Sequence, residues 1–504
     1  MIDASGCRGK ESEEKKINIE GIVEMKNYVV AIDVGSSEIK IAVGSIAEGG
    51  AINIECIVTE PCDGVTAGLI SNNQTAGNAL RAAREKAEKL TGIAITDAYV
   101  SISGKFVRCA RYTDHVFVED KDNCIAREDV LNLSNRMHNV KAEDNENIMD
   151  LFPICYTNDA GAEMKNPVGS YSKQLTSTYN YILCERNAEE RFRRIFRDAH
   201  ISIQGMFASA AVISESMITA EEKEEGVAIV DIGSEVTDVA IYRGGALCYI
   251  VSIPIGGMAI NSDIHHYASQ IPLPAIEKLK RIHGSALASN TTNVTINIQK
   301  GARNLMPIQS LNLAAIIEAR MTDIVDYVWN EIREAGFAKK LSAGIVLTGG
   351  AANLKDVAEL FQKITGVETR VACAELGLTP ESLEKATSPN LTLAVSLLLH
   401  GAKKGATPVG AIQRSAEPTA DIEEKKDDQS SVVEKKPVTV VEEDNSDEQE
   451  DDFVDEDGED EDIPSESSSK RGGFWSRMKD KFRSSLDKAF QNPDVNDEDD
   501  NDDY

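Results

Sequence analysis

The chain has 504 residues, enough for two or more domains with a large buried core, and a formal net charge of −31. Residues 421–504 hold 31 acidic and 11 basic side chains, so the negative charge is concentrated in the tail. Such a balance repels phosphates and argues against nucleic-acid binding. The nine cysteines are scattered without a Cys-x-x-Cys pair, which argues against a zinc site or a disulfide framework and favours a cytoplasmic protein.

The body of the chain predicts an α/β fold. Residues 1–26 are charged and lack an apolar signal-peptide core, so we expect a disordered leader there. Residues 27–403 alternate between strand-like and helix-like stretches. We expect strands at Tyr28–Val34, Ile39–Gly44, Val227–Ile232, Val236–Tyr242 and Gly344–Leu347. We expect helices at Thr75–Leu90, Ala188–Ala199, Leu273–His283, Leu313–Ala335 and Leu354–Ile364.

One sequence pattern occurs twice, about 200 residues apart. The stretch Ala31-Ile-Asp-Val-Gly-Ser36 recurs as Ile229-Val-Asp-Ile-Gly-Ser234, and a second apolar strand follows each copy. A single Asp-x-Gly segment is most often only a β-hairpin turn. Two copies, each followed by an apolar strand, instead predict two similar lobes that face each other.

The residues of these hairpins suit a metal-bound phosphate. Gly35 permits a tight turn, and the backbone N–H groups of Gly35, Ser36 and Ser37 can point at one anion. Asp33 ends the first strand, where its carboxylate can hold Mg²⁺ through water. The second hairpin offers a corresponding set, which consists of Asp231, Gly233, Ser234, Thr237 and Asp238.

A third element is a buried strand that ends in glycines. Residues 344–353 read Gly-Ile-Val-Leu-Thr-Gly-Gly-Ala-Ala-Asn, and a helix is expected from about Leu354. Its backbone amides and helix N-terminus would face a flat or anionic group. The residues that would line this turn are Gly349, Gly350, Ala351 and Asn353.

In this order, the three elements resemble the phosphate 1, phosphate 2 and adenosine motifs of the actin, chaperone-ATPase and sugar-kinase superfamily. The stretches Ser209–Ser216 and Leu391–Gly401 are similar to its interlobe helices. The resemblance implies a two-lobed ATP-binding fold in which Asp33 and Asp231 position Mg²⁺ and water. It implies at most a slow ATPase.

Several further stretches resemble the bacterial cell-division family FtsA, namely 101–105, 166–169, 243–247, 280–287 and 344–352. The family carries an inserted subdomain, IC, in its first lobe and a subdomain, IIB, in its second. The resemblance implies the first lobe (IA) from 27–97, IC at 98–185, the junction with the second lobe (IIA) at 186–257, IIB at 258–338 and the adenosine motif within 339–403.

The second phosphate hairpin departs from the family pattern Asp-x-Gly-Gly-Gly-Thr. Ser234 and Glu235 replace two glycines, and Val236 replaces a threonine. A carboxylate close to bound phosphates would repel them strongly if it pointed inward. Because Gly233 still allows the turn, we expect Glu235 to point outward, and we expect ATP binding to be better preserved than ATP turnover.

The chain ends in an acidic linker (404–471), a basic and aromatic island (472–491) and an acidic tail (492–504). The linker carries too much charge and too few apolar groups to fold. The island has apolar side chains at helical spacing flanked by bases, which is typical of an interfacial membrane helix. A helix that docks on the body or on a partner is the alternative. The membrane-facing candidates are Phe474, Trp475, Met478, Phe482, Leu486 and Phe490, with Arg477 and Lys481 beside them.

The FtsA resemblance implies a scaffold at the division septum, on the cytoplasmic face of the inner membrane. It implies contacts with the carboxyl-terminal tail of the tubulin-like protein FtsZ, with anionic lipids, with later division proteins and with other copies in actin-like filaments. Arg320, in the IIB region, suits an acidic tail, although a structural ion pair is an equal alternative. Two other functions stay open: a small-molecule kinase of the same superfamily, and another actin-like membrane scaffold for cell shape or pilus assembly.

Overall fold

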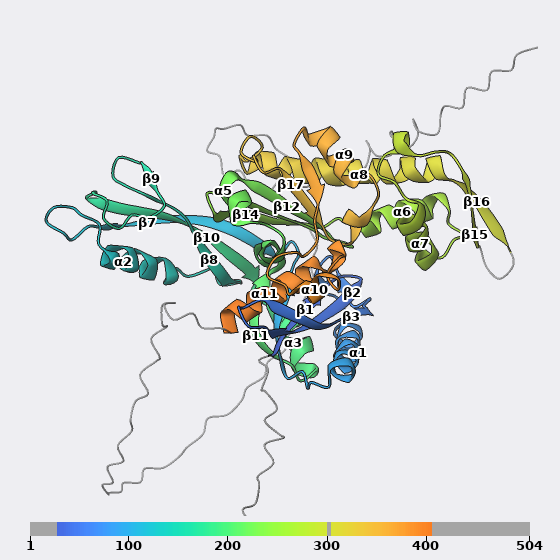
Figure 1. Ribbon diagram of the computed structural model, residues 1–504, viewed down its shortest axis with the longest axis horizontal. Coiled ribbons are helices and arrows are strands. Elements are labelled where there is room, and N and C mark those ends of the chain that lie inside the picture. The colour runs from blue at the N-terminus through green and yellow to red at the C-terminus, as the bar shows by residue number, and fades with distance from the viewer. Residues whose placement is uncertain (1–27, 300–303, 406–504) are drawn as a thin grey trace, which may run out of the picture. The chain divides into compact units, whose positions relative to one another are not determined.

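The computed structural model describes residues 28–299 and 304–405 (Figure 1). The predicted leader, acidic linker, terminal island and acidic tail therefore lie outside the described residues. All five predicted strands and all five predicted helices are present, with small shifts at their ends. Within residues 28–299 and 304–405, no helix combines the length and the apolar character needed to cross a bilayer.

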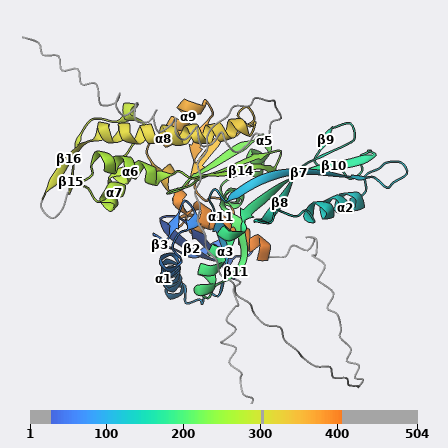
Figure 2. The same cartoon turned by 180° about the vertical axis from the view of Figure 1, so that it is seen from behind.

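The first lobe is built on a five-stranded sheet in the order β11-β6-β1-β2-β3. Seen from behind, α1 and α3 lie together on one side of it (Figure 2). Helix α1 begins where Asn72 Oδ1 accepts hydrogen bonds from the amides of Gln74 and Thr75, and it ends at Gly92, which has a φ of +70°. The elements are β1 (Tyr28–Val34), β2 (Glu38–Ile46), β3 (Ile52–Pro61), β6 (Asp97–Ile102), β11 (Ser202–Ala208), α1 (Asn73–Thr91) and α3 (Arg186–Asp198), with the short pair β4 (Val65–Thr66) and β5 (Leu69–Ile70).

The second lobe repeats this plan in the order β14-β13-β12-β17-β18. In each lobe an antiparallel meander supplies three strands, and two parallel strands complete the sheet. The repeated Asp-x-Gly-Ser pattern thus marks two lobes of the same topology. The elements are β12 (Val227–Ile232), β13 (Thr237–Arg243), β14 (Ala246–Ile253), β17 (Ile345–Thr348), β18 (Thr369–Val371), α5 (Ala220–Glu225), α6 (Gly257–Tyr267), α7 (Leu273–His283), α8 (Ser310–Glu334) and α9 (Val357–Thr365), with the hairpin β15 (Thr295–Gln299) and β16 (Leu305–Gln309).

Strand β1 is buried on both faces because each face meets a different layer. Val30 and Ile32 point into the cluster that contains the α1 and α3 side chains, whereas Val29 and Ala31 pack with α11. A strand covered on both sides is apolar along its whole length rather than alternating. The motif at its end is therefore held by a rigid, fully packed strand.

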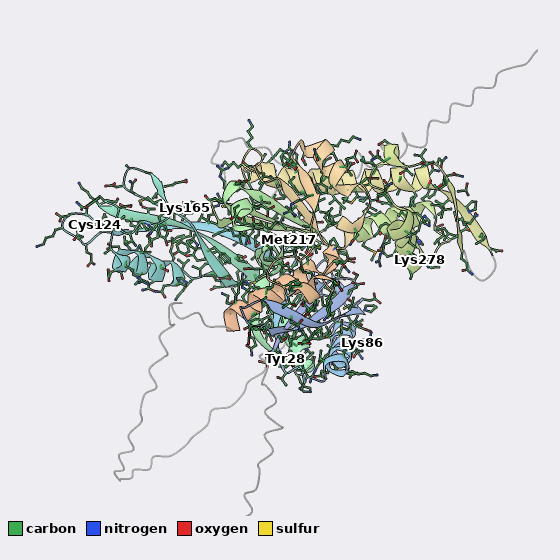
Figure 3. All side chains as sticks on the ribbon, in the orientation of Figure 1. Tyr28, Lys86, Cys124, Lys165, Met217 and Lys278 are labelled. Atoms are coloured by element: carbon green, nitrogen blue, oxygen red, sulfur yellow. The ribbon has the colours of Figure 1, made fainter. Side chains whose placement is uncertain are left out.

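The two lobes are joined by short helices and by α11 (Thr392–Gly405), which packs on β1. The other joining elements are α4 (Ser209–Val212), the 3₁₀ turn Ile213–Ser216, α10 (Pro380–Leu383) and the 3₁₀ turn Pro389–Leu391. Met217, labelled in Figure 3, is buried in a cluster with Ala210 of α4, Ile213 and side chains of both sheets. At the crossing, Ser216 and Ser396 exchange a hydrogen bond of 2.6 Å between their hydroxyls. The predicted interlobe helices are therefore present.

A second sheet, in the order β7-β10-β8-β9, is inserted in the first lobe together with α2 (Arg127–His138). Its strands are β7 (Val107–Phe117), β8 (Glu146–Thr157), β9 (Glu163–Met164) and β10 (Gln174–Glu185). The boundary predicted at residue 98 falls inside β6, which pairs with β1 and β11 in the first-lobe sheet. Residues 97–102 therefore belong to that sheet and not to the insert.

Candidate functional site: two Asp-x-Gly-Ser hairpins and a glycine turn

The first hairpin places a cation directly across from its aspartate. Asp33 pairs with Lys40 in the β1–β2 register, and Lys40 Nζ donates to Asp33 Oδ2 at 3.2 Å. From the parallel neighbour β6, Ser101 Oγ donates to Asp33 Oδ1 at 3.0 Å. Burial lowers the pKa of Lys40, but the Asp33 and Glu38 carboxylates outweigh it, so the pKa is raised and Lys40 stays charged.

The second hairpin has a carboxylate where the first has the lysine. Asp231 lies opposite Asp238 in the β12–β13 register. Burial, together with the carboxylates of Asp238 and Asp33, raises the pKa of Asp231 to about 8. Burial also raises the pKa of Asp238 to about 6, although the hydroxyls of Ser103 (2.6 Å) and Ser252 donate to it. The Lys40 cation acts against this rise but does not cancel it, and a bound cation would add further positive charge.

The glycine turn after β17 lies against Asp231. Gly349 has a φ of +89°, and a Cβ added to it would come within 2.2 Å of Asp231 Oδ1. The Gly349 amide donates to the Pro389 carbonyl at 3.1 Å, which ties the turn to the start of α11. Residues 350–353 form a 3₁₀ turn, so α9 begins at Val357 and not at the predicted Leu354. The predicted helix N-terminus is thus replaced here by a 3₁₀ turn.

A buried lysine, Lys280, lies beside the glycine turn on the second-lobe side of the site. Lys280 Nζ donates to the Gly257 carbonyl at 3.1 Å and pairs with Glu277 at 2.7 Å, and burial lowers its pKa. A Cβ on Gly257 would lie 3.3 Å from Ala351 Cβ, 3.4 Å from Lys280 Nζ and 3.6 Å from the Gly233 carbonyl oxygen. The second hairpin, the glycine turn and Lys280 therefore converge at the start of α6.

Two amides predicted to face phosphate serve the turns instead. The Gly35 N–H donates to the Glu38 carbonyl at 3.0 Å, and the Gly233 N–H donates to the Val236 carbonyl at 2.9 Å. These bonds close the same turn in both hairpins. We therefore expect only the amides of the residues that follow, Ser36, Ser37 and Ser234, to face phosphate. Thr237 is fully buried, and its hydroxyl donates to the Ile255 carbonyl at 2.8 Å. Its side chain therefore stabilises the second hairpin within the protein.

Glu235 does not point outward as expected. Its Oε2 accepts a hydrogen bond of 2.6 Å from the Ala67 amide, in the turn between β4 and β5 of the first lobe. The Gly68 amide donates to Ser36 Oγ at 3.2 Å. The physical reason is that the first lobe offers the Ala67 backbone amide to this carboxylate.

Sequence reasoning missed several residues of this site. Lys40 could have been found, because a two-stranded antiparallel hairpin places it across from Asp33. Ser101, Ser103 and Lys280 lie in the stretches 101–105 and 280–287 that resemble FtsA, but the resemblance gave them no role. Their positions beside the hairpins depend on contacts between segments far apart in sequence, which no local pattern shows.

The remaining predicted residues lie apart from the site or outside the described chain. Arg320, on α8, donates to both carboxylate oxygens of Asp263 at 2.5 and 3.0 Å and to Asp323 at 3.2 Å. The ion-pair alternative therefore describes its state in this structure. Asn353 is exposed at the edge of the glycine turn, with its amide on the Gly350 carbonyl at 3.2 Å. The membrane-facing candidates all lie within 474–490, outside the described residues.

The site holds carboxylates of the kind that can bind Mg²⁺, namely Asp33 and Asp231. Among the described residues, no three His, Cys, Asp or Glu side chains group as ligands for a metal ion. Asp33 and Asp231 are close enough for the charge of one to raise the pKa of the other. A magnesium ion held there would need ligand oxygens from water and phosphate, as Mg²⁺ usually has.

Comparisons with known proteins support the resemblance seen in the sequence. Residues 228–396 match the family model of the cell division protein FtsA. The chain is 28% identical to FtsA of Escherichia coli K12 over 385 residues, which covers 75% of this chain and 90% of that protein. It is 26% identical to FtsA of Pseudomonas aeruginosa over 412 residues, which covers 80% and 97%.

Among solved structures, a chain of the PilM–PilN type IV pilus biogenesis complex matches with a TM-score of 0.51 and 13% sequence identity. The match covers 74% of this chain and 98% of that one. At this identity the likeness concerns the fold alone. The FtsA resemblance and the two-lobed actin-like fold class are confirmed.

Proposed function

We propose that this chain, which resembles FtsA along most of its folded body, is an actin-like ATP-binding protein of cell division. In this proposal it tethers an FtsZ ring to the inner face of the cytoplasmic membrane and helps to assemble the division machinery. One observation carries the nucleotide part: two hairpins from separate sheets and one glycine turn meet around Asp231, where the carboxylates of Asp33, Asp231 and Asp238 face the single cation of Lys40.

Different residues of the site would hold the cation, the phosphates and the adenosine of Mg·ATP. Asp33 and Asp231 would hold the cation through water, while the amides of Ser36, Ser37 and Ser234 would face the phosphates. Gly349, Gly350 and Ala351 would carry the adenosine, and Gly349 has to be a glycine because a Cβ would lie 2.2 Å from Asp231 Oδ1. The bound cation neutralises phosphate charge, and the chain's own residues hold and orient the nucleotide. Since Ser234 and Glu235 replace glycines, we expect turnover to be slow.

The tethering part of the proposal depends on two surfaces. The terminal island, residues 472–491, would lie in the membrane interface, with its bases on anionic head groups at roughly 1 kcal/mol each. The FtsZ tail would bind the region of α6 and α8, where Arg320 is held by Asp263 and Asp323. An acidic tail would have to compete with these two carboxylates for the guanidinium.

Recruitment of FtsZ to vesicles tests this function. The full chain is mixed with FtsZ polymers and with vesicles of phosphatidylglycerol and phosphatidylcholine, and the vesicles are sedimented with Mg·ATP present. We expect FtsZ in the pellet only when the chain is added. The same chain ending at residue 471 should leave FtsZ in the supernatant, and so should FtsZ without its carboxyl-terminal tail.

The controls separate the two surfaces. The truncated chain should still bind the FtsZ tail peptide in solution, because the binding region lies in the body. If the full chain pellets with vesicles but never carries FtsZ with it, the division-ring role is wrong. If truncation leaves sedimentation unchanged, the membrane anchor is wrong.

A further inference from the structure

The short turn between β4 and β5 has an unusual backbone. Ala67 has a φ of +47° and Gly68 a φ of +80°, so two successive residues are left-handed. Alanine in this conformation costs roughly 1–2 kcal/mol, which other contacts must offset. Its two amides donate to different acceptors, the Ala67 amide to a carboxylate and the Gly68 amide to a hydroxyl. The turn therefore presents one backbone donor, the Ala67 amide, to a negative group.

The negative group in front of this turn comes from the other lobe. Glu235 Oε2 accepts from the Ala67 amide at 2.6 Å, and both groups are partly shielded from water. The neighbouring Gly68 amide donates to Ser36 Oγ in the first phosphate hairpin at 3.2 Å. The turn at 65–70 is thus tied to both phosphate hairpins at once.

A second interlobe contact lies beside the first. Gly68 packs so closely on the segment that follows β6 that an added Cβ would be 2.0 Å from the Ser103 carbonyl oxygen. The Ser103 hydroxyl in turn donates to Asp238 of the second lobe at 2.6 Å. Displacement of the 65–70 turn would therefore disturb both contacts between the lobes.

We propose that the Glu235 carboxylate is a built-in anion that latches the 65–70 turn to the second lobe without a terminal phosphate. The hairpin that carries Glu235 is one expected to face phosphate, so the inference rests on the proposed function in that respect. A charge-assisted hydrogen bond of this length is worth more than a neutral one, and it is formed within one chain. A terminal phosphate entering between the hairpins would have to compete with it, because two anions repel at short range.

Hydrogen exchange of the 65–70 amides in the full, nucleotide-free chain tests the latch. We expect the wild-type Ala67 amide to be protected, and Glu235→Gly to speed its exchange about tenfold or more, as loss of a charge-assisted bond implies. Glu235→Gln keeps an acceptor and should speed it less. Glu48→Gly, at an exposed glutamate between β2 and β3, removes the same charge and adds the same glycine, and should leave the exchange rate unchanged.

The second part of the experiment measures the same amide exchange with Mg·ATP present. Added to Glu235→Gly, Mg·ATP should slow the Ala67 exchange again, because phosphate then supplies the anion, whereas the wild-type rate should change little. The latch is refuted if the Ala67 amide exchanges equally fast in wild type and in Glu235→Gly, or if the wild type is protected only after ATP is added. A chain that binds no ATP would contradict the proposed function, yet the nucleotide-free comparison would still decide the latch.

Discussion

Asp231→Asn should stabilise the nucleotide-free protein at neutral and alkaline pH. Asp231 lies opposite Asp238 and near Asp33, and its pKa is about 8 instead of the ordinary 3.8. That difference corresponds to at most about 6 kcal/mol of penalty on the ionised form, at about 1.4 kcal/mol per pH unit. Asp231 is only half-buried and asparagine keeps a polar group in the site, so we expect a gain of about 1–3 kcal/mol at pH 8.

The raised pKa of Asp231 determines in which direction the stability of the wild type changes with pH. Between about pH 4 and pH 8 the folded state keeps the Asp231 proton while the unfolded chain has released it. Stability therefore falls as the pH rises through this window and levels off above it. Asp231→Asn removes this contribution, so its stability should depend less on pH.

Urea unfolding of the full chain at pH 5, 6.5 and 8, without nucleotide and with a chelator, measures the effect. Asp144→Asn, at an exposed carboxylate between α2 and β8, is the matched control and should follow the wild type. The electrostatic account of the site fails if Asp231→Asn is less stable than wild type at pH 8, or if its slope with pH is the same.

Three further substitutions probe the glycine turn and the core. Gly349→Ala should destabilise the fold by roughly 1–3 kcal/mol and weaken nucleotide binding, because the new Cβ would meet Asp231 at a positive φ. Calorimetric titration with Mg·ATP measures the binding, and an affinity equal to that of the wild type would contradict the prediction. Phe361→Ala, at a fully buried position of α9, should cost about 3–5 kcal/mol in urea unfolding. Phe117→Ala, where the ring is 70% exposed, should change stability by less than about 0.5 kcal/mol, and an equal loss in both would refute the assigned core.

The parts of the site that could be predicted are those that depend on local chemistry. A buried apolar strand followed by Asp-x-Gly-Ser specifies a strand, a turn and a carboxylate at the strand end. The hairpins at Asp33 and Asp231 and the strand before Gly349 were therefore located correctly. The repeat predicted two lobes, and their identical strand order explains why the same motif fits both.

The parts that could not be predicted depend on partners distant in sequence. Glu235 turns toward the first lobe because the Ala67 amide lies there, 168 residues away in the chain. The helix predicted from Leu354 begins only at Val357, since Asp356 adopts a left-handed φ of +63° that no sequence pattern announces. Thr237 was expected to face phosphate, but the Ile255 carbonyl takes its hydroxyl.

Equilibrium dialysis of the full chain against labelled ATP is the most direct test of the central claim. We expect each chain to retain one ATP, binding to require Mg²⁺, and Asp231→Ala to lose most of the bound ATP. If the wild-type chain retains no ATP with Mg²⁺ present, the two hairpins and the glycine turn do not form a nucleotide clamp.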